Sequence, residues 1–269
     1  MMSKNIRLYD THCHLNSQML INNFDEIIKI CQQKKIILNC VGTNYKDSCI
    51  AVAQAKKYPN IIKAAIGIHP YEIQNISDIK QLEELYLSNK EYIVAWGEIG
   101  LDYYQKPNNE TIKQQKLFFI QQIKLANKYN LPIIVHVRDQ KTIAMNDCLE
   151  LLEVHSKTSK VLIHFFTGDK EICKKIIAHD YYISLSGVIT FKNSQEINDA
   201  LTLIPSNRLL IETDAPYATP IPHRGETNRP YYLEYIYEYL VKKLKHDDLQ
   251  KLLLGNSLTF FGIRSNDEN

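Results

Sequence analysis

Two histidines and an aspartate alternate in the sequence DTHCH near the start of the chain, as Asp10, His12 and His14. The apolar run just before them predicts a β-strand over Ile6–Asp10. Because side chains of an extended chain alternate between two faces, these three residues should project to one side and Cys13 to the other. Two imidazoles on one face can chelate a divalent metal ion, and a neighbouring carboxylate can bind it or orient the rings. A lone His-x-His pair is more often a surface feature, so a metal site requires further ligands elsewhere.

Such ligands follow later predicted strands. Short apolar, β-branched runs predict eight strands, which are Ile6–Asp10, Ile36–Val41, Ile61–Gly67, Ile93–Glu98, Ile133–His136, Val161–His164, Tyr182–Ser186 and Leu209–Thr213. Glu98, His136 and His164 close the fourth, fifth and sixth of these strands, and Asp214 follows the eighth. In a βα barrel the carboxyl ends of the strands meet at one face, where active sites of that fold are built. We therefore expect these side chains to share one metal site.

Segments with helical spacing separate the strands. They are Phe24–Lys34, Lys46–Lys57, Ser77–Leu87, a segment after residues 107–109, Thr142–His155, Asp169–Asp180, Ser194–Leu203, Pro230–Lys243 and Asp247–Leu254. This alternation predicts an α/β fold with a parallel sheet, either a barrel or an open doubly wound sheet. The glycine-rich phosphate loops typical of the open sheet are missing. We expect a (β/α)8 TIM barrel in a single domain over residues 1–269, a length near the roughly 250 residues typical of that fold.

The composition is that of an ordinary globular protein, with 45% hydrophobic and 23% charged residues and a formal net charge of +2. Such a charge neither demands nor excludes a nucleic-acid partner. Six cysteines without CxxC spacing, no signal segment and no long apolar run predict reduced thiols in a cytoplasmic protein with no membrane partner.

Oxygen and nitrogen ligands without thiolates suit Zn²⁺, Mn²⁺, Fe or, with more water, Mg²⁺. Six candidate ligands are too many for one catalytic ion that must keep an open position, so they suit two ions with a shared carboxylate. Glu98 is the candidate bridge. A pair of ions generates hydroxide near neutral pH and stabilises charge on the attacking and leaving oxygens. Asp214 can hold a metal and accept a proton from the attacking water.

Six motifs resemble the signatures of the TatD family, whose members are metal-dependent deoxyribonucleases with a distorted TIM barrel in the amidohydrolase superfamily. In chain order they read DTHCH from Asp10, GIHP from Gly67, GEIGLDY from Gly97, HVR from His136, HFFTG from His164 and ETDAPY from Glu212. The resemblance covers nearly the whole chain. A lone DxHxH is shared by many amidohydrolases, whereas GEIGLDY and ETDAPY together are far more specific.

The resemblance implies roles for the matching residues. One metal would be held by His12, His14 and Asp214, the second by His136 and His164, and Glu98 would bridge the two. Asp214 would also position or deprotonate the water.

The resemblance also implies substrate contacts. His69 and Arg138 would face the substrate phosphate, for which a planar guanidinium is well matched, and Arg224 could add a contact. Alternatively, Arg138 forms a salt bridge to Asp139 or Asp102, and His69 only caps a turn. The loop Thr227–Pro230 departs from the family's Arg-Asn-Glu-Pro, which leaves its role open.

These observations favour metal-dependent hydrolysis of phosphodiester bonds in DNA, from a strand end or in single strands, by a monomer. The alternative within the superfamily is a hydrolase of an amide, ester or small phosphoester, because metal-bound hydroxide attacks carbonyl and phosphorus centres alike. Arg138 and Arg224 favour phosphorus. A third possibility is a barrel that binds metal or nucleic acid without catalysis, and the intact ligand set argues against it.

Overall fold

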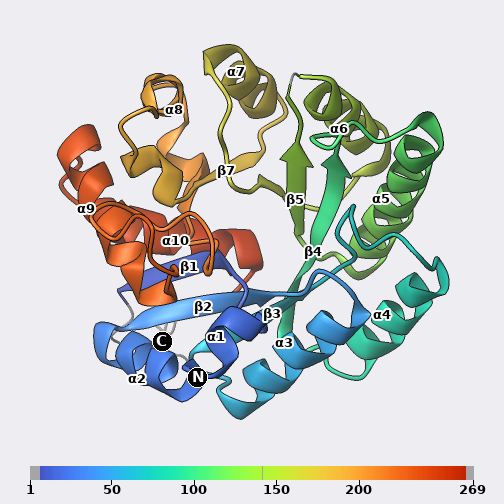
Figure 1. Ribbon diagram of the computed structural model, residues 1–269, viewed down its shortest axis with the longest axis horizontal. Coiled ribbons are helices and arrows are strands. Elements are labelled where there is room, and N and C mark those ends of the chain that lie inside the picture. The colour runs from blue at the N-terminus through green and yellow to red at the C-terminus, as the bar shows by residue number, and fades with distance from the viewer. Residues whose placement is uncertain (1–6, 141, 265–269) are drawn as a thin grey trace.

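Eight parallel strands form one sheet in chain order in the computed structural model, which describes residues 7–140 and 142–264 (Figure 1). The strands are β1 (Leu8–Cys13), β2 (Ile36–Val41), β3 (Ile62–Ile66), β4 (Ile93–Asp102), β5 (Ile133–Arg138), β6 (Val161–Ile163), β7 (Tyr182–Leu185) and β8 (Leu209–Ile211). The protein is a TIM barrel, as the sequence predicted. The predicted strand start at Ile6 and both ends of the predicted 1–269 domain lie outside the described residues.

Helices surround this sheet (Figure 1). They are α1 (Gln18–Ile21), α2 (Phe24–Lys34), α3 (Tyr45–Lys57), α4 (Ser77–Leu87), α5 (Asn109–Tyr129), α6 (Ile143–His155), α7 (Lys170–Ala178), α8 (Gln195–Leu201), α9 (Leu233–Leu244) and α10 (Leu249–Phe261). Three 3-10 turns, η1 (Gly187–Thr190), η2 (Ser206–Arg208) and η3 (Pro230–Tyr232), complete the described elements. The helix predicted from Pro230 therefore begins as the turn η3, and the short helix α1 was not predicted.

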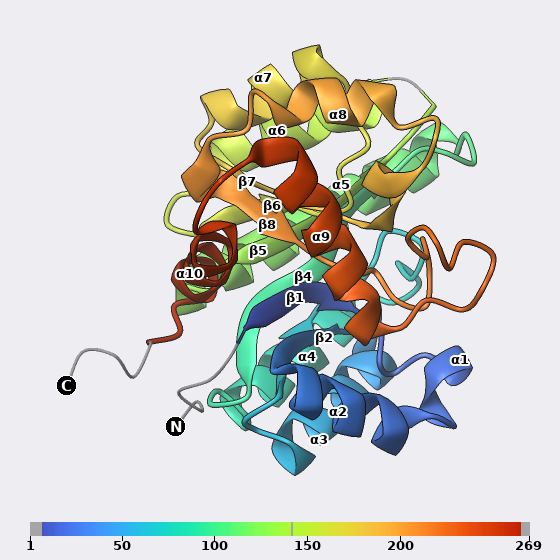
Figure 2. The same cartoon turned by 90° about the vertical axis from the view of Figure 1, so that its left-hand side faces the viewer.

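The last helix is longer than the sequence pattern indicated. Gly255, Asn256 and Ser257 resemble a helix stop, yet α10 continues to Phe261. The Asn256 side chain donates hydrogen bonds to the backbone carbonyls of Ser206 and Leu209, which ties the helix to β8. Tertiary contacts thus override weak helix propensity. Figure 2 shows α10 on the side of the barrel opposite the long loop that follows β8.

Two apolar layers hold the fold together. The larger lies between the sheet and the surrounding helices. The smaller fills the barrel with inward side chains such as Ile37, Ala95 and Leu162, and Phe260 and Phe261 of α10 pack against it. Strands buried on both faces explain the nearly continuous apolar runs of the sequence.

The junction of β1 and β8, here called the seam, differs from the other strand pairings. No regular ladder joins the two strands among the described residues, although hydrogen bonds cross between them. The Thr11 hydroxyl donates to the Ile211 carbonyl (3.0 Å), and the backbone N–H of Asp214 donates to the His12 carbonyl (2.8 Å). The backbone N–H of His14 donates to the Ala215 carbonyl (2.7 Å). The nearly closed barrel thereby holds the histidine pair beside the Asp214 loop.

All six cysteines are free, and no described helix is both long and apolar enough to cross a membrane.

Candidate metal centre

Strands β4 and β5, the ends of β1 and β6, and the loop after β8 bring the other five predicted ligands together around Glu98. Glu98 and His136 do not close their strands as predicted, because β4 continues to Asp102 and β5 to Arg138. Each of five histidines brings one ring nitrogen within 4 Å of the Glu98 carboxylate. Glu98 Oε1 lies 2.9 Å from His136 Nδ1, 3.0 Å from His164 Nε2 and 3.6 Å from His69 Nε2, and Oε2 lies 3.4 Å from His12 Nε2 and 3.7 Å from His14 Nε2.

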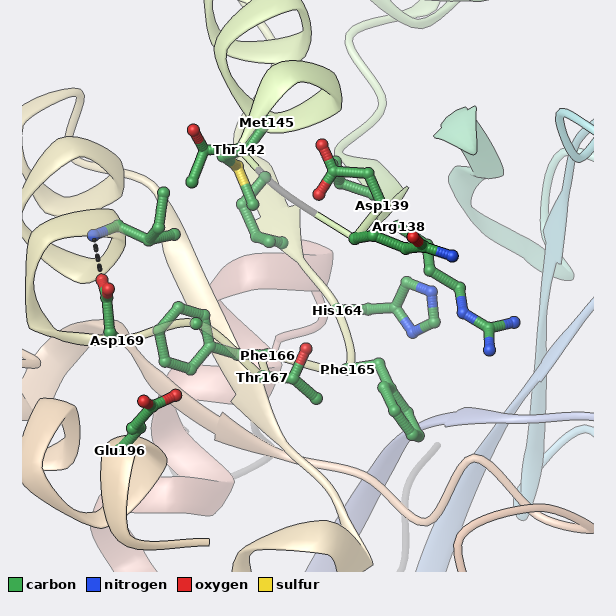
Figure 3. A pocket seen from close by; sticks show the side chains of 15 residues that line it. Arg138, Asp139, Thr142, Met145, His164, Phe165, Phe166, Thr167, Asp169 and Glu196 are labelled. Atoms are coloured by element: carbon green, nitrogen blue, oxygen red, sulfur yellow. Dashed lines mark hydrogen bonds between the residues drawn. The ribbon is translucent and has the colours of Figure 1, made fainter. Parts of the chain in front are cut away.

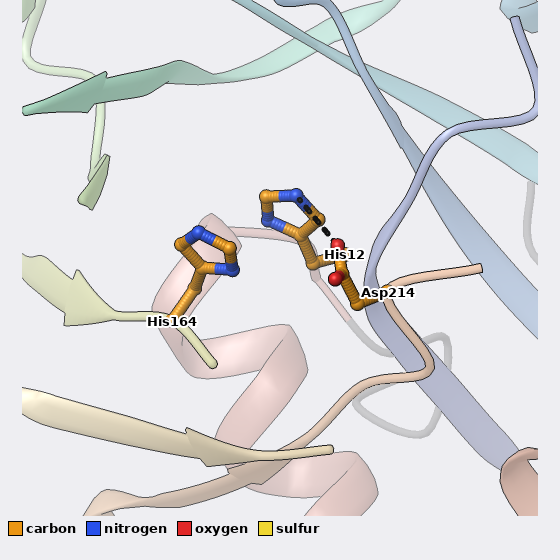
Figure 4. Close-up of side chains that lie close together, drawn as sticks. All are labelled: His12, His164 and Asp214. Carbon is orange, nitrogen blue, oxygen red and sulfur yellow. Dashed lines mark ion pairs between the residues drawn. The ribbon is translucent and has the colours of Figure 1, made fainter. Parts of the chain in front are cut away.

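Asp214 completes the cluster from the opposite side of the seam. Its Oδ1 lies 3.4 Å from His14 Nε2 and 3.7 Å from His12 Nε2. Figure 4 shows the His12 and His164 rings and the Asp214 carboxylate facing one another, and the two rings stack with centroids 4.0 Å apart. Asp214 adopts a left-handed backbone conformation (φ 54°), which is uncommon outside glycine and asparagine-like residues and turns the chain sharply at this point.

Backbone and carboxylate partners fix how the rings point. The Nδ1–H of His14 donates to the Val41 carbonyl oxygen (3.2 Å), so Nε2 presents its lone pair to the cluster. His136 is oriented in the opposite sense, since its Nε2–H donates to Asp102 Oδ2 (2.9 Å) and its Nδ1 faces Glu98. Metal-bound histidines commonly have such outer partners.

Sequence reasoning missed two of these outer carboxylates, Asp102 and Glu212. Asp102 is buried and also accepts hydrogen bonds from the Tyr71 hydroxyl and the Tyr104 backbone N–H, both 2.9 Å. Glu212 Oε1 lies 3.4 Å from His164 Nδ1, an ion-pair distance without hydrogen-bond geometry. Both residues stand within the GEIGLDY and ETDAPY motifs.

The pKa shifts show a cluster built around one buried anion. Burial alone would raise the pKa of Glu98, but the neighbouring histidines, first His164 and then His69, outweigh it and hold the pKa well below the usual value. Burial alone would lower the pKa of His164. The charges of Glu98 and Glu212 outweigh burial and raise this pKa well above its usual value. Burial and the neighbouring His136 lower the pKa of His69 to about 3. Glu98 is therefore an ionised acceptor for cations.

The donor set fits divalent ions. His12 Nε2 and His14 Nε2 face each other at 3.2 Å. Two nitrogen lone pairs at this distance repel each other, and a cation bound by both nitrogens would remove the repulsion. Potential ligand atoms gather within 4.8 Å of one another in the trio His12, His14 and Glu98 and in the trio Glu98, His136 and His164. The two trios share Glu98, as a bridging carboxylate would require.

The predicted substrate contacts lie in different surroundings. His69 Nδ1 accepts the Tyr71 N–H (3.1 Å), so it caps a turn while its other nitrogen faces Glu98. The Arg138 guanidinium lies 4.0 Å from the centre of the Tyr104 ring, and no carboxylate pairs with it among the described residues. Arg224 lies over the Phe191 ring at 4.2 Å, and no contact with the histidine cluster is seen in the described part of the chain.

The loop with the unusual sequence Thr227–Pro230 has a structural role. The side chain of Asn228 is fully buried and donates hydrogen bonds to the backbone carbonyls of Thr213 (2.8 Å) and Tyr217 (2.5 Å). It thereby supports the turn that carries Asp214, which the sequence alone did not indicate.

Comparison with known proteins agrees with these features. The family model described as TatD related DNase matches residues 9–262. An uncharacterized metal-dependent hydrolase of Mycoplasma genitalium is 35% identical over 263 residues, which cover 94% of this chain and 98% of the relative. The uncharacterized metal-dependent hydrolase YabD of Bacillus subtilis is 34% identical over 95% of this chain and 99% of its own. The crystal structure of YjjV, a TatD homologue of Escherichia coli, superposes with a TM-score of 0.86 at 25% identity, covering 96% of this chain and 99% of that one.

Proposed function

The chain belongs to the TatD-related DNase family of metal-dependent hydrolases, and from this premise we propose that it hydrolyses phosphodiester bonds in DNA. The proposed substrate is a single strand or a strand end, and the proposed reaction uses water activated by two divalent ions. The observation that carries this proposal is the sharing of Glu98 between two trios of potential ligands. The chemistry of paired divalent ions is well suited to displacement at phosphorus.

In the proposed arrangement His12, His14 and Asp214 would hold one ion and His136 and His164 the other, with Glu98 shared between them. When bound, divalent ions lower the pKa of water and offset the negative charge that develops on the phosphodiester. The Asp214 carboxylate, 8% exposed at the edge of the cluster, accepts the proton of the attacking water. Its Oδ1 already faces the same space as His12 and His14.

Arg138 is the proposed phosphate contact. It is exposed, unpaired with any described carboxylate and held over the Tyr104 ring, so its N–H groups are free to donate to phosphate oxygens. His69 is the second proposed phosphate contact. Its ring lies 4.3 Å from the His136 ring and so borders the candidate metal centre. Arg224 is a more distant candidate contact.

The test is incubation of the protein with end-labelled single- and double-stranded DNA in Mg²⁺, Mn²⁺ or Zn²⁺. We expect stepwise shortening of the labelled strand by the wild type. Removing the bridging or proton-accepting carboxylate, in Glu98→Gln or Asp214→Asn, should lower the rate at least about a hundredfold. Asp147→Asn is a matched control, because Asp147 pairs with Lys116 and Tyr103 outside the cluster.

Intact DNA under all three metals, with turnover of an ester or amide panel, would replace this proposal with the broader amidohydrolase-type activity. Metal binding without any turnover would favour a barrel that no longer catalyses. Equal rates for the wild type and Glu98→Gln would contradict the proposed role of Glu98 as the bridging carboxylate.

A further inference from the structure

A pocket of about 340 Å³ adjoins the candidate metal centre, between the loops that follow β5 and β6 (Figure 3). We call it the side pocket. His164, whose Nε2 faces Glu98, forms part of its wall, and Arg138 lines it as well. A phosphodiester bound at the centre can therefore extend one of its two substituents into this space.

The walls of the side pocket are of two kinds. Part of its lining is apolar and includes the buried Phe166 and Ile172 and the partly buried Phe165 and Met145. A flat, uncharged ring gains free energy from contact with such side chains, and aromatic faces are common partners of nucleobases.

Carboxylates outnumber guanidinium and ammonium groups among the described residues of the side pocket, so a phosphate is favoured only beside Arg138. Carboxylates of Asp139, Asp169 and Glu196 line it, against the single guanidinium of Arg138 among the described lining residues. Two of the carboxylates are already engaged, because Asp139 accepts the Ala144 N–H (2.7 Å) and Asp169 accepts the Ile172 N–H (2.9 Å). Glu196 is exposed and pairs with no described cation, so its carboxylate remains available to a donor on a ligand.

We propose that the side pocket binds the base of the nucleotide next to the scissile phosphate, an inference that rests on the proposed hydrolysis of DNA. Its volume lies in the range of small-ligand pockets, roughly 300–1,000 Å³. Cytosine, adenine and guanine carry exocyclic amino groups that can donate to Glu196, whereas thymine carries none. A base can enter only after leaving its stack and its partner, so the inference restricts the substrate to nucleotides that are unpaired at the cleavage point.

Calorimetric titration of the Mn²⁺-loaded protein tests this inference. The ligands are the 5′- and 3′-monophosphates of deoxycytidine, deoxyribose 5-phosphate and inorganic phosphate. Base contacts should make one of the deoxycytidine monophosphates bind about tenfold more tightly than the sugar phosphate. Thr167→Trp, at an exposed residue lining the side pocket, should abolish this preference and leave phosphate affinity unchanged. Thr202→Trp is the control, because exposed Thr202 lies outside the pocket.

A second variant tests the inference even if Thr167→Trp does not fold. Glu196→Gln replaces an exposed carboxylate and should reduce the preference for deoxycytidine over thymidine monophosphate. Equal affinity of the wild type for nucleotide and sugar phosphate would overturn the inference, and so would a preference that survives in folded Thr167→Trp. DNA hydrolysis without base-dependent binding contradicts only the proposal that the side pocket binds a base. Base-dependent binding with intact DNA contradicts only the proposed function.

Discussion

At the scale of single residues, the cluster is organised by one buried carboxylate with histidines on two sides. Glu98 is 3% exposed and approaches five imidazoles, yet it stays ionised because those imidazoles offset its burial. A buried anion without a permanent cation is costly in a folded protein. A site that binds divalent ions would explain this cost, because the ions would offset the buried charge.

Asp102 provides a test at this scale. Because its Oδ2 accepts the Nε2–H of His136, Asp102→Asn should loosen the orientation of that ring and weaken metal binding by about 10- to 100-fold. Titration with Mn²⁺ under competition with a chelator measures the change. The Asp147→Asn variant should bind as the wild type does, and equal affinity of Asp102→Asn would show that Asp102 does not orient a ligand.

The pH dependence of metal binding follows from the raised pKa of His164 in the metal-free protein. Burial alone would lower this pKa, but Glu98 and Glu212 raise it well above its usual value. The protonated ring therefore stabilises the metal-free fold below about pH 6.5, and this contribution is lost as pH rises through the raised pKa. Since only the neutral ring binds metal, affinity should increase as the pH rises toward the raised pKa and level off above it.

Calorimetry in two buffers of different ionisation enthalpy measures the protons released. Binding of Mn²⁺ near pH 7 should release at least one proton, and Glu212→Gln should release fewer because the pKa of His164 falls. Absence of proton release in the wild type would contradict the assignment of His164 as a ligand.

At the scale of elements, β4 determines how the cluster is assembled. Its pairing with β5 shifts register between Trp96 and Ile99, after which Gly100 pairs with His136. Gly100 has a φ of +150°, and a Cβ there would lie 1.9 Å from the His136 carbonyl oxygen. Only glycine allows the two strands to approach at the point where Glu98 meets His136.

Gly100→Ala should consequently destabilise the protein by about 3 kcal/mol, because the clash is with backbone rather than a movable side chain. Gly255→Ala is the matched control. Gly255 lies within α10 with nothing close to its missing Cβ, so alanine should increase stability by up to about 1 kcal/mol. Urea unfolding gives both values, and similar stability of Gly100→Ala and the wild type would refute the close-approach argument.

Strand β4 and its neighbours include features that the sequence predicts and others that it does not. Apolar runs and ligand-type residues at their ends predicted the barrel and the grouping of Glu98, His136 and His164, because strand ends of this fold converge. The pairing of Asp102 with His136 depends on the register shift within β4, which a period-two pattern does not reveal. The support that Asn228 gives to the Asp214 turn depends on a loop contact between segments with no shared periodicity.

At the scale of the whole molecule, the seam couples closure of the barrel to the site. Asp10 does not face the other ligands as the alternation of β1 suggested. Instead its carboxylate accepts hydrogen bonds from the backbone N–H (2.8 Å) and the hydroxyl (2.5 Å) of Thr213. Thr213 immediately precedes Asp214, so Asp10 holds the last of the predicted ligands beside the first strand.

Asp10→Ala should cost about 1–3 kcal/mol in the free energy of unfolding, because two buried donors of Thr213 lose their acceptor. Asp10→Asn keeps one acceptor oxygen and should cost less. Thermal and urea unfolding of the metal-free proteins compare them. An unchanged stability in Asp10→Ala would show that the seam is closed by other contacts.

The most direct test of the central claim is anomalous diffraction from crystals of the protein loaded with Mn²⁺. The account predicts two anomalous peaks per chain, about 3.5–4 Å apart and both within bonding distance of Glu98. His12 and His14 should contact one peak, and His136 and His164 the other. A single peak, or two peaks that Glu98 does not join, would contradict it.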